Sequence, residues 1–284
     1  MKVQRITVIG AGTMGNGIAG QAALCGYDVI LNDVDDARID VGLAAIRRTW
    51  SKGINRGKVA QGAVDAAESR LGRCTSIEEA VTNADLIIEA VPENMELKKA
   101  LFARFEAAAP NHAIFGSNTS SLSITEIASS VERPDRVIGT HFFNPVAVMK
   151  LLELVRGEYT SEETLATLQA VSETLGKEAI VVNDAPGFAT SRLGIALGNE
   201  AMRMFEEGVA SAADIDKAMV LGYRHPIGPL ALTDLVGLDV RLAISEHLHR
   251  EIGSDTFRPP RILRKMVRAG KLGRKSGRGF YEYD

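Results

Sequence analysis

A glycine-rich turn near the N-terminus constrains the fold of this chain more than any other feature. The hexapeptide Gly10-Ala11-Gly12-Thr13-Met14-Gly15 directly follows the apolar segment Ile6–Ile9. This spacing is typical of a strand that turns sharply into a helix. The first glycine permits the turn, the second leaves the backbone open to a phosphate, and the third lets the helix pack closely on the strand. Because the N-terminus of such a helix attracts anions, the segment predicts a phosphate-binding strand–turn–helix unit.

An acidic residue at the end of the next expected strand extends this prediction to a dinucleotide. Asp33 follows the glycine turn by about 20 residues, where a carboxylate can accept hydrogen bonds from the adenosine ribose hydroxyls. Because Val34–Asp36 contains no arginine, the sequence favours NAD over NADP. The alternative is that Asp33 is an ordinary turn or helix-capping aspartate. We predict cofactor contacts at Gly10, Gly12, Thr13, Met14, Gly15 and Asp33.

Hydrophobic patterning indicates an α/β fold for the first part of the chain. Up to about Val182, short apolar runs alternate with longer amphipathic segments, as expected for parallel strands joined by helices. Two of the helices should begin at capping boxes, in Ser76–Glu79 and Thr160–Glu163. The pattern predicts a doubly wound, Rossmann-type sheet. Its expected strands are Ile6–Ile9, Val29–Leu31, Leu86–Ala90, Ala113–Phe115, Val137–Phe142, Leu151–Val155 and Ala179–Val182.

The pattern changes after Asp184-Ala185-Pro186-Gly187. Strand-like segments end there, and long apolar-periodic stretches such as Ile195–Phe205 and Leu235–Leu248 follow. A loose basic tail is expected at Lys271–Lys275. We therefore expect an NAD-binding domain over residues 1–184 and an all-helical C-terminal domain over residues 185–284.

Composition narrows the class of protein. A formal net charge of -3 supplies no overall positive field, so a nucleic-acid partner is not expected. Cys25 and Cys74 lie far apart without a CxxC pattern, which fits a reducing compartment. No signal-type segment follows Met1 and no apolar run reaches membrane-spanning length, so we expect a cytoplasmic protein without a membrane partner. No metal ligands are predicted.

His141 is the best candidate for a catalytic acid or base. It ends an expected strand, on the side of the sheet where ligands of such folds bind. Glu153 lies alone within the apolar segment Leu151–Val155, and buried charge is costly unless paired. If the two strands adjoin, the carboxylate could orient the imidazole and stabilise its protonated form. The alternatives are a structural histidine and an edge-strand glutamate that faces water. Ser117–Leu122 supplies short donors at the same sheet edge, or caps a helix.

The chain resembles the 3-hydroxyacyl-CoA dehydrogenase family along essentially its whole length, and particularly its short bacterial members that act on 3-hydroxybutyryl-CoA. The resemblance implies that His141 is the general acid/base, that Glu153 is its partner, and that Ser120 lies near the substrate carbonyl and the nicotinamide. It further implies cofactor contacts at Glu93, Lys98, Asn118, Ser120, Asn144 and Lys275; the alternative, for Lys98 and Lys275 above all, is a solvated surface charge. The matching motifs are Gly10–Gly15, Glu89–Asn94, Ser117–Leu122, His141–Pro145, Asp184–Phe188, Gly228-Pro229 and Gly277–Tyr281.

The same resemblance implies an acyl-CoA substrate and a homodimer. It suggests that coenzyme A binds the helix after the second strand, where residues 47 to 58 contain five basic residues and no acid. Lys52 and Arg56 are four residues apart and should share one face of that helix, where they could bind phosphates. The alternative is a solvated charged face.

One position departs from the family pattern. The family reads Pro-Gly-Phe-x-x-Asn-Arg, whereas this chain reads Pro186-Gly187-Phe188-Ala189-Thr190-Ser191-Arg192. Ser191 therefore stands where a substrate-orienting amide is expected. Two other functions remain open from the sequence: a dehydrogenase of free hydroxy acids or sugar acids on the same scaffold, and a nucleotide-binding protein without turnover.

Overall fold

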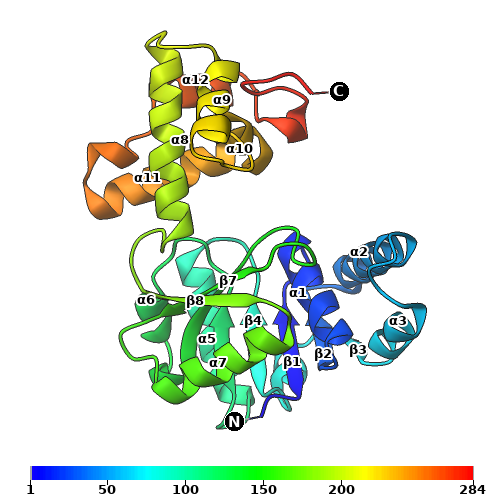
Figure 1. Cartoon of the computed structure of the whole chain (residues 1–284). Helices are drawn as coiled ribbons and strands as arrows, with labels where there is room; N and C mark the ends of the chain where they lie inside the picture. Colours follow the sequence, from blue (N-terminus) through cyan, green and yellow to red (C-terminus); the bar gives the residue numbers. More distant parts are fainter. Residues whose placement is uncertain (1, 284) are drawn as a thin grey trace. The chain divides into compact units, whose positions relative to one another are not determined.

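The computed structural model describes residues 2–283 and separates into two compact units (Figure 1). The first ends at Asp184 and the second begins at Ala185. The first unit is α/β and the second is helical. This confirms the predicted fold class.

An eight-stranded sheet organises the first unit, in the order β3-β2-β1-β4-β5-β6-β7-β8. Strands β1 to β6 are parallel, and β7 and β8 run in the opposite direction. The central strands are almost continuously apolar because helices cover both faces of a parallel sheet. The strands are β1 (Arg5–Ile9), β2 (Asp28–Asn32), β3 (Leu71–Cys74), β4 (Leu86–Glu89), β5 (Ile114–Ser117), β6 (Val137–Phe142), β7 (Leu151–Arg156) and β8 (Glu178–Asn183).

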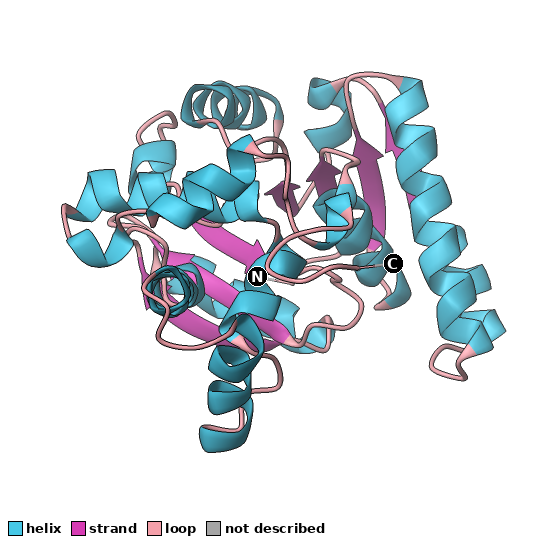
Figure 2. Ribbon diagram, turned by 90° about the horizontal axis from the view of Figure 1, so that it is seen from above, coloured by secondary structure: helices cyan, strands magenta, loops and turns pink. Residues whose placement is uncertain are grey.

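Helices cover both faces of this sheet (Figure 2). Helices α1 and α7 pack on one face, where their apolar side chains join those of α2 in one core, and α4, α5 and α6 pack on the other. The helices of this unit are α1 (Thr13–Leu24), α2 (Asp36–Asn55), α3 (Gln61–Glu68), α4 (Ile77–Val81), α5 (Met95–Ala108), α6 (Ile124–Ala128) and α7 (Glu162–Thr174), with a 3-10 turn η1 (Pro134–Arg136).

All seven expected strands form, and three details of the prediction were wrong. Strand β3 was missed, because Gly72 and Arg73 interrupt its apolar character and all of it lies at one edge of the sheet. Strands β7 and β8 are not parallel to the rest. Ser76 does cap α4 through the Glu79 N–H, but α7 is capped by Ser161 and not by Thr160. The Thr160 hydroxyl instead donates to the Val137 carbonyl at 2.6 Å.

The second unit consists of helices around a small apolar core that includes Met202, Leu230 and Leu263. The expected helical stretch Leu235–Leu248 is interrupted, because Gly237 adopts a φ of 103° and separates two helices. The basic tail is not loose: the Leu272 N–H donates to the Ser276 hydroxyl at 2.8 Å, and Gly273 pairs with Arg278. The elements are α8 (Thr190–Glu206), α9 (Ala212–Gly222), α10 (Pro229–Val236), α11 (Leu238–Ile252), η2 (Asp255–Phe257), α12 (Arg261–Arg268) and η3 (Arg274–Ser276).

Within residues 2–283, no helix combines the length and apolar character needed to cross a membrane. The same residues contain no group of three or more histidine, cysteine, aspartate or glutamate side chains arranged to hold a metal ion.

Candidate active site

The glycine turn lies where the strand order reverses, between the carboxyl ends of β1 and β4, which is where open α/β sheets bind ligands. Gly10 has a φ of +102°, and a Cβ there would lie 2.7 Å from the Ala90 carbonyl oxygen. A Cβ on Gly15 would overlap the Gly10 carbonyl, whereas a Cβ on Gly12 would meet nothing within 4 Å. The backbone at Gly12 is therefore open to a ligand, and the other two glycines are required by packing.

The N-terminus of α1 can receive a negative charge. Gly12 is its N-cap and provides no side-chain hydrogen bond, and the first turn contains no acidic residue. The helix dipole and the backbone N–H groups at this end therefore attract an anion such as the pyrophosphate of a dinucleotide. The residues present fit that group.

Asp33 follows β2 and faces the glycine turn. Its Oδ2 accepts a hydrogen bond of 2.8 Å from the Ala11 N–H, and its Oδ1 accepts one of 2.8 Å from the Val34 N–H. Asp33 does not cap a helix, because Asp35 caps α2 through the Arg38 N–H. The sequence reading overlooked Arg38, whose Nη1 lies 4.0 Å from Asp33 Oδ1 and whose side chain is exposed.

His141 and Glu153 face each other across the only antiparallel strand pair of the described sheet. They are register partners on β6 and β7, and His141 Nδ1 lies 2.6 Å from Glu153 Oε2. Glu153 is fully buried, and β7 is flanked by β6 and β8, so the reading of an edge glutamate facing water was wrong. A carboxylate in this position fixes the orientation of the imidazole ring.

Two neighbours hold the end of β6 in place. The Asn118 side-chain oxygen accepts a hydrogen bond of 2.9 Å from the Phe142 N–H, which ties the loop after β5 to β6. The Phe143 ring lies against the His141 ring, with centroids 4.4 Å apart. Asn144, the next residue, is exposed and precedes Pro145 through a cis peptide bond.

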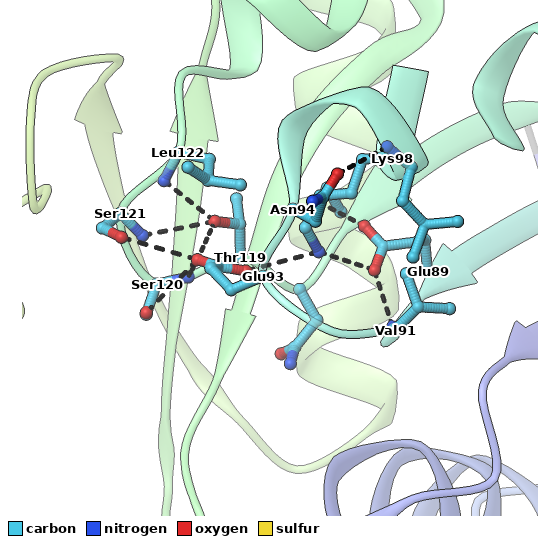
Figure 3. Close-up of polar contacts among 12 residues, drawn as sticks. Glu89, Val91, Glu93, Asn94, Lys98, Thr119, Ser120, Ser121 and Leu122 are labelled. Carbon is cyan, nitrogen blue, oxygen red and sulfur yellow. Dashed lines mark hydrogen bonds and ion pairs between the residues drawn. The ribbon is translucent and has the colours of Figure 1, made fainter. Parts of the chain in front are cut away.

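Glu93 organises the loop that carries Ser120 (Figure 3). Its Oε1 accepts hydrogen bonds from the Ser120 N–H at 3.0 Å, from the Ser120 hydroxyl at 3.4 Å and from the Thr119 hydroxyl. The Thr119 hydroxyl in turn accepts from the Leu122 N–H at 2.9 Å. One partly exposed carboxylate thus fixes the backbone of the segment predicted to contact substrate.

Lys98 is not a solvated surface charge. Its side chain is 0% exposed, and its Nζ lies 2.7 Å from Glu89 Oε1 and 3.4 Å from Glu93 Oε2. Glu89 is also 0% exposed, and it accepts hydrogen bonds of 2.7 Å from both Ser117 Oγ and the Val91 N–H. The sequence analysis assigned no role to Glu89, although Glu89 is the first residue of the Glu89–Asn94 motif. The chain Glu89–Lys98–Glu93 connects the end of β4 to the Ser120 loop (Figure 3).

The basic residues predicted to bind coenzyme A lie at the end of α2. Lys52 is in the last turn of the helix, Arg56 is its C-cap, and both are exposed. Among residues 2–283, no carboxylate forms an ion pair with either side chain. Arg47 is different, because it pairs with Glu68 of α3.

Two predicted site residues belong to the second unit. Ser191 lies in the first turn of α8. Lys275 lies in η3, and its Nζ donates to Asp239 Oδ2 at 2.7 Å. Partial burial alone would raise the pKa of Asp239, but the hydrogen bond from Lys275 holds that pKa below its ordinary value.

Comparison with known proteins assigns the chain to a family. Residues 5–185 match the family "3-hydroxyacyl-CoA dehydrogenase, NAD binding domain" and residues 187–283 match its "C-terminal domain". The 3-hydroxybutyryl-CoA dehydrogenase of Clostridioides difficile is 45% identical over 280 residues, covering 99% of each chain. The crystal structure of (S)-3-hydroxybutyryl-CoA dehydrogenase PaaH1 from Ralstonia eutropha is similar with a TM-score of 0.95 and 42% identity, and that of M. tuberculosis FadB2 with a TM-score of 0.97 and 39% identity; each covers 100% of both chains. This chain belongs to the 3-hydroxyacyl-CoA dehydrogenase family.

Proposed function

We propose that this protein is an NAD-dependent (S)-3-hydroxyacyl-CoA dehydrogenase that interconverts 3-hydroxybutyryl-CoA and acetoacetyl-CoA. The observation that carries the proposal is the His141–Glu153 pair, which stands at the carboxyl end of β6 in a sheet whose β1 end carries an open dinucleotide turn. Relatives that share this chain's full length bear the name of that activity.

NAD, when bound, accepts or donates the hydride. Gly12 and the N-terminus of α1 hold the pyrophosphate, and Asp33 accepts hydrogen bonds from the adenosine ribose hydroxyls. Toward the reacting end of the cofactor we assign the remaining contacts to Glu93, Asn118, Ser120, Asn144 and Lys275. Because Lys98 is buried, we propose that its ammonium group holds Glu93 in place, in addition to any contact that the Lys98 backbone makes with the cofactor.

His141 moves the proton. In the oxidation direction, the imidazole takes the proton from the C3 hydroxyl; in the reduction direction, the imidazolium returns it to the carbonyl oxygen. Glu153 engages Nδ1, which leaves proton exchange with the substrate to Nε2. As the imidazole becomes charged, the buried carboxylate stabilises it, as in other carboxylate–histidine pairs.

Ser120 and Ser191 orient the substrate in this proposal. The Glu93 carboxylate fixes the Ser120 backbone, so the Ser120 hydroxyl is placed as a donor toward the developing oxyanion at C3. We assign Ser191 to the acyl group because it occupies the position of the substrate-orienting asparagine in the family pattern. Lys52 and Arg56 bind the phosphates of coenzyme A, because both are exposed cations without an acidic partner among residues 2–283.

We further propose a cytoplasmic homodimer that assembles through the second unit. Several large apolar side chains are exposed there, including Leu193 (71%), Leu221 (69%) and Tyr223 (77%). Exposed apolar surface often marks a protein–protein interface, so we assign the dimer contact to these side chains. Sedimentation measurements would report the oligomeric state, and Leu221→Glu with Tyr223→Glu should yield a monomer.

The activity is tested by NADH oxidation with acetoacetyl-CoA, compared with free acetoacetate and with 3-ketoacyl-CoAs of increasing chain length. The proposal predicts turnover of the short CoA thioesters and little turnover of the free acid. Preference for the free acid would favour a hydroxy-acid dehydrogenase. Tight NADH binding without turnover of either compound would identify a nucleotide-binding protein that has lost the reaction.

A further inference from the structure

Lys177 is a buried cation of the first unit that lies directly before β8. Its side chain belongs to a residue that is 7% exposed, and no carboxylate among residues 2–283 forms an ion pair with it. Burial lowers the pKa of Lys177, as expected for an ammonium group that has lost water. Two backbone carbonyls replace that water: the Nζ donates to the Met149 oxygen at 2.8 Å and also to the Val146 oxygen. Both carbonyls belong to the connection between β6 and β7.

This connection, residues 143–150, folds over the ammonium group of Lys177. The Pro145 carbonyl accepts a hydrogen bond of 3.0 Å from the Met149 N–H, which closes a turn within the connection. The two carbonyls that bind Lys177 lie on this turn, and the hydrogen bond to Val146 is buried. A buried carbonyl without a donor is costly, so the conformation of the turn depends on the lysine.

The same connection packs on α1, the helix that begins at the glycine turn. Val146 is 3% exposed and belongs to the apolar core that α1 and α7 share. A Cβ on Gly17 of α1 would lie 2.9 Å from Val146 Cγ2 and 3.1 Å from Val146 Cβ. Gly17 therefore leaves the space that Val146 fills. Lys177 and α1 hold the connection from two sides.

The connection begins with two residues at the candidate active site. The Phe143 ring lies against the His141 ring, with centroids 4.4 Å apart. Asn144 is exposed and is assigned to the cofactor under the proposed function. Because Asn144 lies two residues before Val146, a shift of the turn that Lys177 holds would move the Asn144 side chain as well.

We propose that Lys177 is a positioning residue of the dehydrogenase. Its ammonium group holds residues 143–150 on α1, so that Asn144 meets the cofactor and Phe143 stays against His141. The inference rests on the proposed function, in which Asn144 contacts NAD. Lys177 acts through the backbone of the connection and not by touching the cofactor or the substrate. A misplacement of about 1 Å can cost about 10²-fold in rate, even when the mutated residue is far from the chemistry.

The experiment compares Lys177→Met with Lys150→Met. Methionine keeps most of the lysine stem without the ammonium group, and Lys150 is an exposed lysine of the same connection that controls for the loss of one charge. Lys177→Met should lower kcat by about 10–10²-fold and raise the Kd for NADH. The KM for acetoacetyl-CoA should stay near its native value, because the proposed phosphate contacts Lys52 and Arg56 lie at the end of α2. Lys150→Met should change none of these constants.

A double-mutant cycle with Asn144→Ala separates positioning from a purely structural role. If Lys177 acts on the cofactor through Asn144, Lys177→Met should raise the Kd for NADH much less in the Asn144→Ala protein than in the native one. A purely structural role would lower stability and leave the Kd of the folded protein unchanged, or would give effects that add. Fluorescence titration with NADH measures each Kd without turnover.

Gly17→Ala displaces the connection from its other side and leaves Lys177 in place, so it provides a second test should Lys177→Met not fold. Alanine favours a helix more than glycine does, so α1 itself should not be weakened. Gly17→Ala should lower kcat and raise the Kd for NADH. Adding Val146→Ala removes the Cγ2 atom that the new Cβ meets, so the double variant should recover part of both losses.

Native values of kcat and of the Kd for NADH in Lys177→Met would overturn the proposal. Additive effects of Lys177→Met and Asn144→Ala would overturn it too, as would native kinetics in Gly17→Ala. If the native enzyme turned over no 3-ketoacyl-CoA, the proposed function would fail, but the NADH titrations would still decide the role of Lys177. Coupled losses in the cycle would support that role, and independent ones would refute it.

Discussion

His141 Nδ1 lies 2.6 Å from Oε2 of Glu153, the residue directly opposite it on the neighbouring antiparallel strand. This pairing depends on the direction of β7. When two residues are register partners on neighbouring strands, their side chains point to the same face of the sheet and lie close together. Reversal of β7 relative to β6 therefore places the buried carboxylate beside the imidazole without any contribution from a loop.

We predict that His141→Ala and Glu153→Gln lower kcat by different amounts while NADH still binds. Removal of a general acid/base typically costs about 10²–10⁴-fold. Glu153→Gln should lower kcat less than His141→Ala does, because the amide still reaches Nδ1 but does not stabilise the imidazolium. Stopped-flow NADH oxidation and fluorescence titration of NADH would separate chemistry from binding. If Glu153→Gln retained native turnover, the carboxylate would be structural only.

Cofactor choice should depend on Asp33 and Arg38 together. Asp33→Ala should raise the KM for NADH and relax discrimination against NADPH, because the ribose acceptor and its repulsion of a 2′-phosphate are lost together. Arg38, whose Nη1 lies 4.0 Å from Asp33, would then become available to a 2′-phosphate. Adding Arg38→Gln to Asp33→Ala should remove the gain with NADPH. If Asp33→Ala showed the same preference for NADH over NADPH as the native enzyme, Asp33 would not be the residue that binds the ribose hydroxyls.

The buried Lys98–Glu89 pair should control stability as well as activity. Lys98→Met leaves Glu89 buried and unpaired, and breaking a buried ion pair typically costs about 3–5 kcal/mol of unfolding free energy. It also removes the ammonium beside Glu93, so the Ser120 loop should be less well held and kcat should fall.

Urea denaturation would measure this loss, with Lys99→Met as the control at the next, partly exposed residue. Combining Glu89→Gln with Lys98→Met should recover much of the stability, because no buried charge is then left unpaired. If Lys98→Met had the same unfolding free energy as the native protein, the Lys98–Glu89 pair would not stabilise the fold.

Charge reversal at the end of α2 tests the coenzyme A contact. Lys52→Glu with Arg56→Glu should raise the KM for acetoacetyl-CoA far more than that for an acetoacetyl pantetheine thioester, which lacks the nucleotide phosphates. The difference should shrink at high salt, because both side chains are exposed. Lys99→Glu with Arg104→Glu on α5 provides a control of equal charge. Equal effects on the two thioesters would place the phosphates elsewhere.

The sequence predicts best what depends on local spacing. The glycine turn at Gly10–Gly15 and the strand ending at His141 are local patterns, so the elements that carry them could be placed without coordinates. The burial of Lys98 could not, because its compensation comes from Glu89 on another element, nine residues away. In the linear sequence, a lysine in the first turns of an amphipathic helix is indistinguishable from a solvated one.

Strand direction and helix breaks depend on similar long-range effects. Leu151–Val155 predicts a strand but not its antiparallel pairing with β6. Leu235–Leu248 keeps a helical period through Gly237, and only the positive φ of that glycine separates α10 from α11. Arg241 on α11 likewise has the sequence context of an ordinary charged helix residue, and only the structure shows that it is buried and that its Nε has no hydrogen-bond partner among residues 2–283.

Ser191→Asn tests the departure from the family pattern, and we predict that it raises kcat/KM for acetoacetyl-CoA. Asparagine offers two amide donors and a carbonyl acceptor at a longer reach than the single serine hydroxyl. One preorganised donor to an oxyanion typically contributes about 10²–10³-fold, but water can replace part of that contribution beside Ser191, so the gain should be smaller. Steady-state kinetics of Ser191→Asn with acetoacetyl-CoA and NADH would decide the question. An unchanged or lower kcat/KM for acetoacetyl-CoA would mean that this site has adapted to serine.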